Sequence, residues 1–104
     1  SNQVLFDVLS TSSASCWSVN TYCPVPGPVP AAPSNNGFQP GFSTALMTKD
    51  LGLAQSAAIS SNASTPLGAE ATHLYRLFMS QGTGELDFSS IIEFMRGSKE
   101  KLDP

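Results

Sequence analysis

The stretch Gly41 to Ala54, GFSTALMTKDLGLA, decides the fold class of this chain. Read as the start of a helix that turns by about 100° per residue, it gathers apolar side chains on one continuous stripe. The members of this stripe are Leu46, Met47, Leu51, Leu53, Ala54, Ala57 and Ala58. Asp50 falls in the middle of the stripe, and Lys49 lies at its edge. A carboxylate in an apolar face is costly unless a cation or several donors meet it, so Asp50 is expected either to fix helix packing or to serve a site.

Two further helices are expected downstream, and no alternating strand pattern is present, so the chain is expected to be all-α. The first of these helices has Thr65 as N-cap and Pro66 at its first position, and Gly82 is placed to stop it. Its apolar face consists of Leu67, Ala71, Leu74, Tyr75 and Phe78. The second has Asp87 as N-cap and ends before Gly97. Its buried residues are expected to be Phe88, Ile91, Ile92 and Met95.

The 104 residues are expected to form a single domain, close to the smallest size at which one core stabilises itself. Its predicted parts are the end of a helix over 1–14, a proline-rich loop over 15–42, three helices over 43–97 and a charged tail over 98–104. Because proline fixes φ and removes a donor, neither a helix nor a central strand is expected within 15–42. Trp17, Tyr22 and Phe38 favour a functional binding segment over a disordered linker in this loop.

Composition excludes several classes of partner. The net charge of −3, from 8 acidic and 5 basic residues, argues against nucleic acid, which requires a basic face. No apolar run is long enough to cross a membrane, and no signal peptide is recognised. Cys16 and Cys23 are expected to be reduced thiols, with a disulfide as the alternative. Two thiols and one distant histidine do not make a metal site, so no metal is expected.

The quoted stretch resembles the C-terminal signature of the 3-hydroxyisobutyrate dehydrogenase family, the β-hydroxyacid dehydrogenases. In that family a Gly-Phe pair precedes a helix that reads roughly Leu-Met-x-Lys-Asp-Leu-x-Leu-Ala. The matching residues here are Gly41, Phe42, Leu46, Met47, Lys49, Asp50, Leu51, Leu53 and Ala54. A second stretch, Ser12 to Trp17 with Tyr22 and the loop Pro24 to Gly27, also resembles the family. Ala14 stands where many relatives have glycine, which affects the expected local turn more than the chemistry.

The resemblance implies a fold and a set of site residues. The fold is the C-terminal helical domain of a 6-phosphogluconate dehydrogenase-like enzyme. Lys49, Asp50 and Phe42 would lie at the nicotinamide end of the cofactor, and Trp17 and Tyr22 would line the substrate pocket. Phe42 could instead be a hydrophobic staple on the helix entry, and Trp17 and Tyr22 could merely anchor the loop to the core.

The resemblance also implies an activity. The family oxidises 3-hydroxyisobutyrate to methylmalonate semialdehyde in valine catabolism, with NAD as the expected cofactor and NADP as the alternative. No GxGxxG turn occurs in this chain, and the family's catalytic lysine lies upstream of the matching region, so no catalytic residue is assigned here. We therefore expect a fragment that is inactive alone.

Several alternatives remain open from the sequence. The substrate could be serine, glycerate or tartronate semialdehyde instead, or the chain could be a non-catalytic helical assembly module. Relatives use this domain for subunit contacts, so a homo-oligomer is expected. The expected compartment is the cytoplasm in a bacterium and the mitochondrial matrix in a eukaryote. A calcium-binding loop is rejected, since the segment Gly82 to Phe88 lacks the required acidic ligands.

Overall fold

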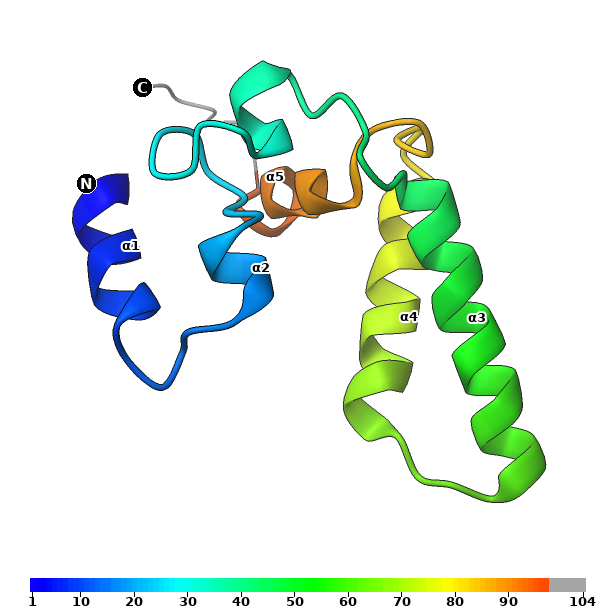
Figure 1. Cartoon of the computed structure of the whole chain (residues 1–104). Helices are drawn as coiled ribbons and strands as arrows, with labels where there is room; N and C mark the ends of the chain where they lie inside the picture. Colours follow the sequence, from blue (N-terminus) through cyan, green and yellow to red (C-terminus); the bar gives the residue numbers. More distant parts are fainter. Residues whose placement is uncertain (98–104) are drawn as a thin grey trace.

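Two antiparallel helices, α3 (Thr44–Ser61) and α4 (Pro66–Met79), form a long hairpin at one end of the molecule (Figure 1). The computed structural model describes residues 1–97. The other elements in that range are α1 (Asn2–Ser10), α2 (Trp17–Asn20), the 3-10 turns η1 (Pro33–Asn36) and η2 (Phe88–Ser90), and α5 (Ile91–Met95). The described residues contain no strand beyond one isolated bridge between Ser43 and Asp87. The prediction of an all-α fold is confirmed.

The ends of the two long helices follow local sequence chemistry. The Ser43 side chain caps α3 by accepting from the Leu46 N–H at 3.2 Å. Asn62, at a φ of 59°, ends α3 in the left-handed conformation that asparagine tolerates better than most residues. Pro66 opens α4, but the Thr65 hydroxyl caps no backbone N–H and instead pairs with the amide of Gln55, 3.1 Å away. The predicted start of α4 is therefore correct although the capping contact differs, while α4 ends at Met79, ahead of the predicted stop at Gly82.

The covered face of α3 overlaps the apolar stripe only in part, at Leu51 and Ala58. It carries the buried residues Thr44 and Ala58 at its two ends and half-buried Thr48, Leu51 and Gln55 between them. The stripe instead leaves Leu46 and Leu53 exposed at 44% and 62%, and Asp50 is exposed with them. Asp50, which the periodicity places in the middle of the stripe, is therefore not enclosed by apolar side chains within residues 1–97. Small and polar side chains face the hairpin, because they allow two helices to approach closely, while the longer apolar ones point outward.

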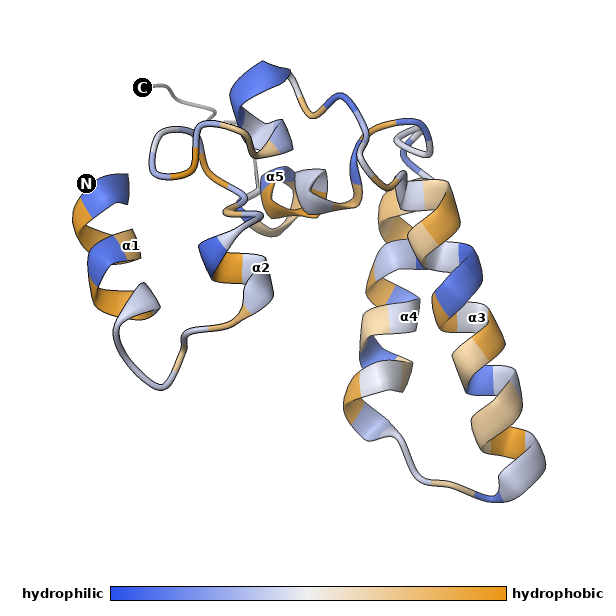
Figure 2. Ribbon diagram, in the orientation of Figure 1, coloured by the Kyte–Doolittle hydropathy of each residue, from blue (hydrophilic) through white to orange (hydrophobic). Residues whose placement is uncertain are grey.

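The core of the described chain is small and largely polar. Its buried apolar residues are Cys23, Ala32, Pro33, Ala58 and Phe78, whereas Thr44, Thr72, Asp87 and Ser90 are almost fully buried. Phe78 packs against Phe94 with ring centroids 5.6 Å apart. Two predicted core residues are wrong, since Leu67 is 81% exposed and Met95 is 61% exposed. Figure 2 shows hydrophobic residues along α1 and α3, where Val4, Leu5, Val8 and Leu53 are exposed.

The segment 15–42 is ordered by side-chain contacts rather than by regular structure. Asn35 accepts from the Gly27 N–H at 2.9 Å and donates to the Val29 carbonyl at 2.8 Å. The Ser34 hydroxyl donates to the Cys23 carbonyl at 3.0 Å. The prediction that no helix forms here is wrong at two short places: α2 ends before the first proline, and η1 begins on Pro33, whose φ suits a first turn.

Three other expectations concern the thiols, the tail and the membrane. Both cysteines are free, with Cys16 exposed and Cys23 buried. The predicted tail over 98–104 lies outside the described residues. Among residues 1–97, no helix has the length and apolar character needed to cross a bilayer.

Replacing Phe78 and Leu67 by alanine tests this division between core and surface. Phe78→Ala should lower the free energy of unfolding by about 3–5 kcal/mol, because it removes the one large apolar side chain buried among residues 1–97. Leu67→Ala should change it by less than about 0.5 kcal/mol, since that side chain is exposed. Urea unfolding of both variants measures the difference, and equal losses would contradict the described packing.

Candidate functional site

Four aromatic rings from three separate segments meet where the loop 15–42 touches η2. We call Trp17, Tyr22, Phe42 and Phe88 the aromatic cluster. The Trp17 and Tyr22 rings are stacked with centroids 4.9 Å apart, and Tyr22 stacks on Phe88 at 5.2 Å. Phe42 meets Phe88 edge-on at 6.0 Å. These separations fall in the favourable range for aromatic pairs. Trp17, at the outer end of the cluster, is 59% exposed and offers its surface to a ligand or a partner.

A short antiparallel pairing brings the cluster together. The Phe88 N–H donates to the Phe42 carbonyl at 2.8 Å, and the Asp87 N–H donates to the Phe38 carbonyl at 2.9 Å. The Thr44 and Ala45 N–H groups then donate to the carbonyls of residues 86 and 84 at 2.8 and 3.0 Å. These two N–H groups belong to the first turn of α3, which has no partners within its own helix. The segment 84–88 therefore fixes the position of Phe42 and the start of α3 together.

The Asp87 carboxylate lies at the centre of this junction and is fully buried. Its Oδ1 accepts from the Tyr22 hydroxyl at 2.6 Å, from the Gly41 N–H at 2.8 Å and from the Phe42 N–H at 3.0 Å. Its Oδ2 accepts from the Ser89 N–H at 3.0 Å and the Ser89 hydroxyl at 2.6 Å. The predicted N-cap role of Asp87 is confirmed by the Ser89 contact. A buried charge is tolerated when several donors surround it, as they do here.

This environment shifts three pKa values. Burial alone would raise the pKa of Asp87, but the hydrogen bonds from Ser89, Tyr22 and the Phe42 N–H outweigh burial and hold it below 3.8. Burial, the Asp87 hydrogen bond and its charge raise the pKa of Tyr22 well above 10. Burial and the charge of Asp87 raise the pKa of Tyr75 to about 12. The Tyr75 hydroxyl donates to the Phe88 carbonyl at 2.9 Å.

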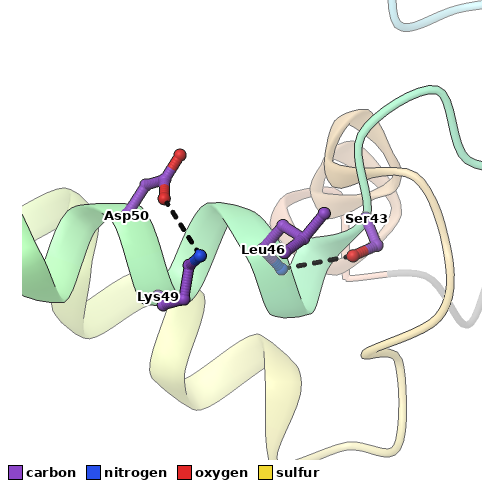
Figure 3. Close-up of polar contacts among 4 residues, drawn as sticks. All are labelled: Ser43, Leu46, Lys49 and Asp50. Carbon is purple, nitrogen blue, oxygen red and sulfur yellow. Dashed lines mark hydrogen bonds and ion pairs between the residues drawn. The ribbon is translucent and has the colours of Figure 1, made fainter.

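Lys49 and Asp50 lie on the outer face of α3, about two turns beyond the Ser43 cap (Figure 3). Their side chains are 61% and 54% exposed, and the Lys49 Nζ lies 3.9 Å from an Asp50 carboxylate oxygen. An exposed ion pair at this distance adds little to stability. No hydrogen bond or ion pair within residues 1–97 joins either side chain to the aromatic cluster. The pair is accessible to a ligand because nothing in the described chain covers it.

The structure brings together three of the five predicted site residues. Trp17, Tyr22 and Phe42 share the aromatic cluster, whereas Lys49 and Asp50 are separate from it. The sequence predicts Phe88 only as a core residue and Asp87 only as a helix cap. Nothing in the sequence near Asp87 indicates partners that lie 46 and 65 residues away. The single local indication that Asp87 could be buried is its position between two apolar residues, Leu86 and Phe88.

The two tyrosines of the chain allow the buried junction to be tested by titration. Their raised pKa values favour the neutral phenol in the folded state. The corresponding stability is fully present below about pH 10, the unfolded pKa, and is lost as the pH rises through the folded values. The lowered pKa of Asp87 has the opposite sign, so its contribution is present above about pH 4 and is lost as the pH falls through the folded value.

We expect the folded chain at about pH 10.5 to show almost no tyrosinate absorbance near 295 nm. The guanidinium-unfolded chain should show more than half of the full signal, because its tyrosines ionise near pH 10. Circular dichroism on the same samples reports whether the chain is still folded. Half-maximal absorbance at about pH 10 from a folded sample would contradict the buried hydrogen bonds of Tyr22 and Tyr75.

Comparison with known proteins identifies the family. A family model described as the NAD-binding region of NADP-dependent 3-hydroxyisobutyrate dehydrogenase matches residues 1–95. A probable 3-hydroxyisobutyrate dehydrogenase of Mycobacterium tuberculosis is 52% identical over 96 residues, which are 92% of this chain and 32% of that protein. The mitochondrial 3-hydroxyisobutyrate dehydrogenase of Bos taurus is 46% identical over 94 residues, which are 90% of this chain and 28% of that protein. The chain thus spans about a third of the length of these relatives.

A solved structure of Mycobacterium tuberculosis 3-hydroxyisobutyrate dehydrogenase, described with L-serine, superposes on the chain with a TM-score of 0.88. It is 52% identical to the chain, and the match covers 92% of the chain and 33% of the solved protein. The resemblance inferred from the Lys49–Asp50 stretch is confirmed by sequence and by fold. The chain therefore belongs to the family of NAD-binding regions of 3-hydroxyisobutyrate dehydrogenases.

Proposed function

We propose that this chain serves an NAD-dependent 3-hydroxyisobutyrate dehydrogenase as the part that closes the site around a small β-hydroxy acid and the nicotinamide end of the cofactor. The assembled aromatic cluster carries this proposal, because it unites residues from positions 17, 22 and 42 that the family resemblance assigns to one site. The chain would contribute binding and enclosure, with proton abstraction supplied by a lysine outside the matched region.

Trp17 and Tyr22 would form the wall of the substrate pocket. A small hydroxy acid has a short carbon skeleton, and a stacked indole and phenol provide an apolar surface that excludes water from it. The exposed face of Trp17 is free for such contact. The Tyr22 hydroxyl donates its proton to Asp87, so that proton is not available to the carboxylate of a bound acid. Tyr22 would therefore act through its ring and its oxygen lone pair.

Lys49, Asp50 and Phe42 would hold the nicotinamide end of NAD. Their chemistry fits that group: an accessible ammonium can donate to a carboxamide or a polarised oxygen, and the adjacent carboxylate, 3.9 Å away, can orient it. Phe42 is half-buried at the start of α3 and can pack against a planar ring. NAD, when bound, accepts the hydride from the hydroxyl-bearing carbon. The residues of this chain position that carbon and exclude water from it.

The activity assay should compare two cofactors and several small hydroxy acids. The family description names NADP, whereas we propose NAD, so both are tested. Serine is included because the matched solved protein is described with L-serine. Glycerate and tartronate semialdehyde complete the panel. Curated relatives come from bacteria and from mitochondria, and we propose a cytoplasmic or a matrix location according to the source.

Grafting residues 1–95 into the Mycobacterium tuberculosis relative, in place of the matching region, tests this function. The graft should oxidise 3-hydroxyisobutyrate with NAD, while the isolated 104-residue chain should show no turnover. Lys49→Ala in the graft should lower kcat/KM by about 100-fold, the usual loss when one charge-stabilising donor is removed. Arg76→Ala, which removes an exposed cation on α4, is the control and should leave kcat/KM within about two-fold. A folded graft without turnover, or turnover by the isolated chain, would refute the proposal.

We also propose that the chain assembles with further copies of itself. The exposed apolar side chains of α1 and α3, together with a described core that contains one large buried apolar residue, support this. Residues such as Leu53, at 62% exposure, form part of a surface that a partner copy would remove from water.

Sedimentation at increasing concentration tests this assembly. The chain should sediment above its mass of 10.9 kDa, and Leu53→Lys should shift it towards the monomer because it places a charge in the apolar contact. Gln81→Lys adds the same charge at an exposed position outside α3 and should leave the assembly unchanged. A strictly monomeric mass at millimolar concentration would contradict the proposal.

A further inference from the structure

Asp87 connects the two sides of the candidate site through one oxygen atom. Its Oδ1 receives the Tyr22 hydroxyl from the substrate side and the Gly41 and Phe42 N–H groups from the cofactor side. Tyr22 and Phe42 are distant in the chain and lie in segments without regular structure. Their relative position is therefore set by shared contacts, among which Asp87 and the Phe88 ring are the common partners.

The junction leaves little freedom for these groups. A Cβ built on Gly41 would lie 2.6 Å from the Tyr22 hydroxyl oxygen and 3.7 Å from Asp87 Oδ1, so the Gly41 backbone sits directly against the hydrogen-bonded pair. Tyr22 is held by stacking contacts with both Trp17 and Phe88. A change at Asp87 would accordingly move the cluster as a unit.

Only a carboxylate satisfies all of these donors. The N–H groups of Gly41, Phe42 and Ser89 cannot reverse their polarity, and they approach both carboxylate oxygens. An asparagine at position 87 would turn its own NH₂ group towards at least one of them in either orientation. The hydroxyls of Tyr22 and Ser89 could reverse, so an asparagine whose NH₂ group takes the place of Oδ1 would also remove the acceptor of the Tyr22 proton.

We propose that Asp87 is a positioning residue for the dehydrogenase site: its carboxylate sets the placement of Tyr22 relative to Gly41 and Phe42 and takes the Tyr22 hydrogen bond, so that Tyr22 presents only an acceptor to a bound hydroxy acid. This role rests on the proposed function for its catalytic consequence. It is distinct from the cap that Asp87 provides to η2, which uses the other carboxylate oxygen.

Because Tyr22 and Ser89 donate to different oxygens of the Asp87 carboxylate, a variant at Ser89 is a matched control for a variant at Tyr22. Tyr22→Phe removes a 2.6 Å bond to Oδ1, and Ser89→Ala removes a 2.6 Å bond to Oδ2. Both variants remove one hydroxyl donor from the same carboxylate, but only the first touches the aromatic cluster. A purely structural Asp87 predicts similar consequences for both variants, whereas a positioning Asp87 predicts an effect on the site only from the first.

The first arm of the test is a tyrosine titration on the 104-residue chain, which does not depend on enzymatic activity. Carbon-13 labelling of the tyrosine ring gives a signal for each of the two tyrosines, and Tyr75→Phe assigns them. In Asp87→Asn the Tyr22 signal should titrate at lower pH than in the unmodified chain, because the negative charge beside the phenol is gone and an amide oxygen is a weaker acceptor than a carboxylate. Ser89→Ala should leave the Tyr22 titration unchanged. An unchanged Tyr22 titration in a folded Asp87→Asn chain would overturn the proposal.

The second arm uses the active graft described above. Asp87→Asn should lower kcat about ten-fold or more while each KM changes by less than about three-fold, since a small misplacement affects the reacting geometry more than ground-state binding. Ser89→Ala should leave kcat within about two-fold. The double variant with Tyr22→Phe should lose less than the product of the single losses, because both changes break the same link. Equal losses of kcat in Asp87→Asn and Ser89→Ala would assign Asp87 a structural role alone and overturn the positioning role.

The two arms separate this proposal from the proposed function. An inactive unmodified graft refutes the dehydrogenase function, while the tyrosine titration still decides whether Asp87 holds Tyr22. If Asp87→Asn does not fold, Tyr22→Phe carries the test, because it breaks the same link at a half-buried residue. Unmodified kcat in a Tyr22→Phe graft would then overturn the positioning role.

Discussion

The buried carboxylate of Asp87 is the interaction on which the rest of this structure depends. It gathers donors from Tyr22 within the loop 15–42, from Phe42 at the end of that loop and from Ser89 in η2. The charge is stabilised by dipoles and hydroxyls, with no ion pair to Asp87 among residues 1–97. Such a site is specific as well as stabilising, because a donor left without its acceptor in a buried position costs more than a hydrogen bond contributes.

The polar character of the core follows from the same arrangement. Thr44 is fully buried and donates to the Leu86 carbonyl at 3.1 Å, next to the point where Asp87 is anchored. Thr72 is almost equally buried and donates to the carbonyl one turn earlier in its own helix. The hydroxyls of these short side chains donate to backbone carbonyls, and the small size of the side chains allows the packed elements to approach closely. Within residues 1–97, burial of large apolar surface is correspondingly limited to Phe78 and its contact with Phe94.

The exposed apolar residues of α3 are explained by comparing this chain with its longer relatives. The chain spans about a third of the length of the relatives it matches, and its fold agrees with the corresponding third of a solved relative at a TM-score of 0.88. Exposed Leu46 and Leu53 on α3 therefore do not indicate a poor fold. They flank Lys49 and Asp50, the same residues that the family signature assigns to the cofactor end, so the surface that carries the proposed chemistry is also the surface left open.

Local sequence determined the two long helices, where they begin, and the family. Ser43 as a cap, Pro66 at a first position and Asp87 before η2 act within a few residues of where they stand, so their roles follow from neighbouring residues alone. The family signature around Lys49 and Asp50 is likewise a local pattern, which a short stretch of sequence is enough to identify. The burial of Asp50 does not follow from such a pattern, since an apolar stripe shows that a face can be buried but not which partner covers it.

Only the tertiary structure decided how the site is assembled. The stacking of Trp17, Tyr22 and Phe88, and the three donors on Asp87 Oδ1, join residues as far apart as the 65 positions between Tyr22 and Asp87, through a loop that has no periodic pattern. Helical periodicity constrains neighbours within a turn or two, whereas contacts across an irregular loop depend on the path of the whole chain. The sequence by itself thus determined the long helices, where they begin, and the family, while long-range hydrogen bonding and ring packing determined which of the predicted site residues meet.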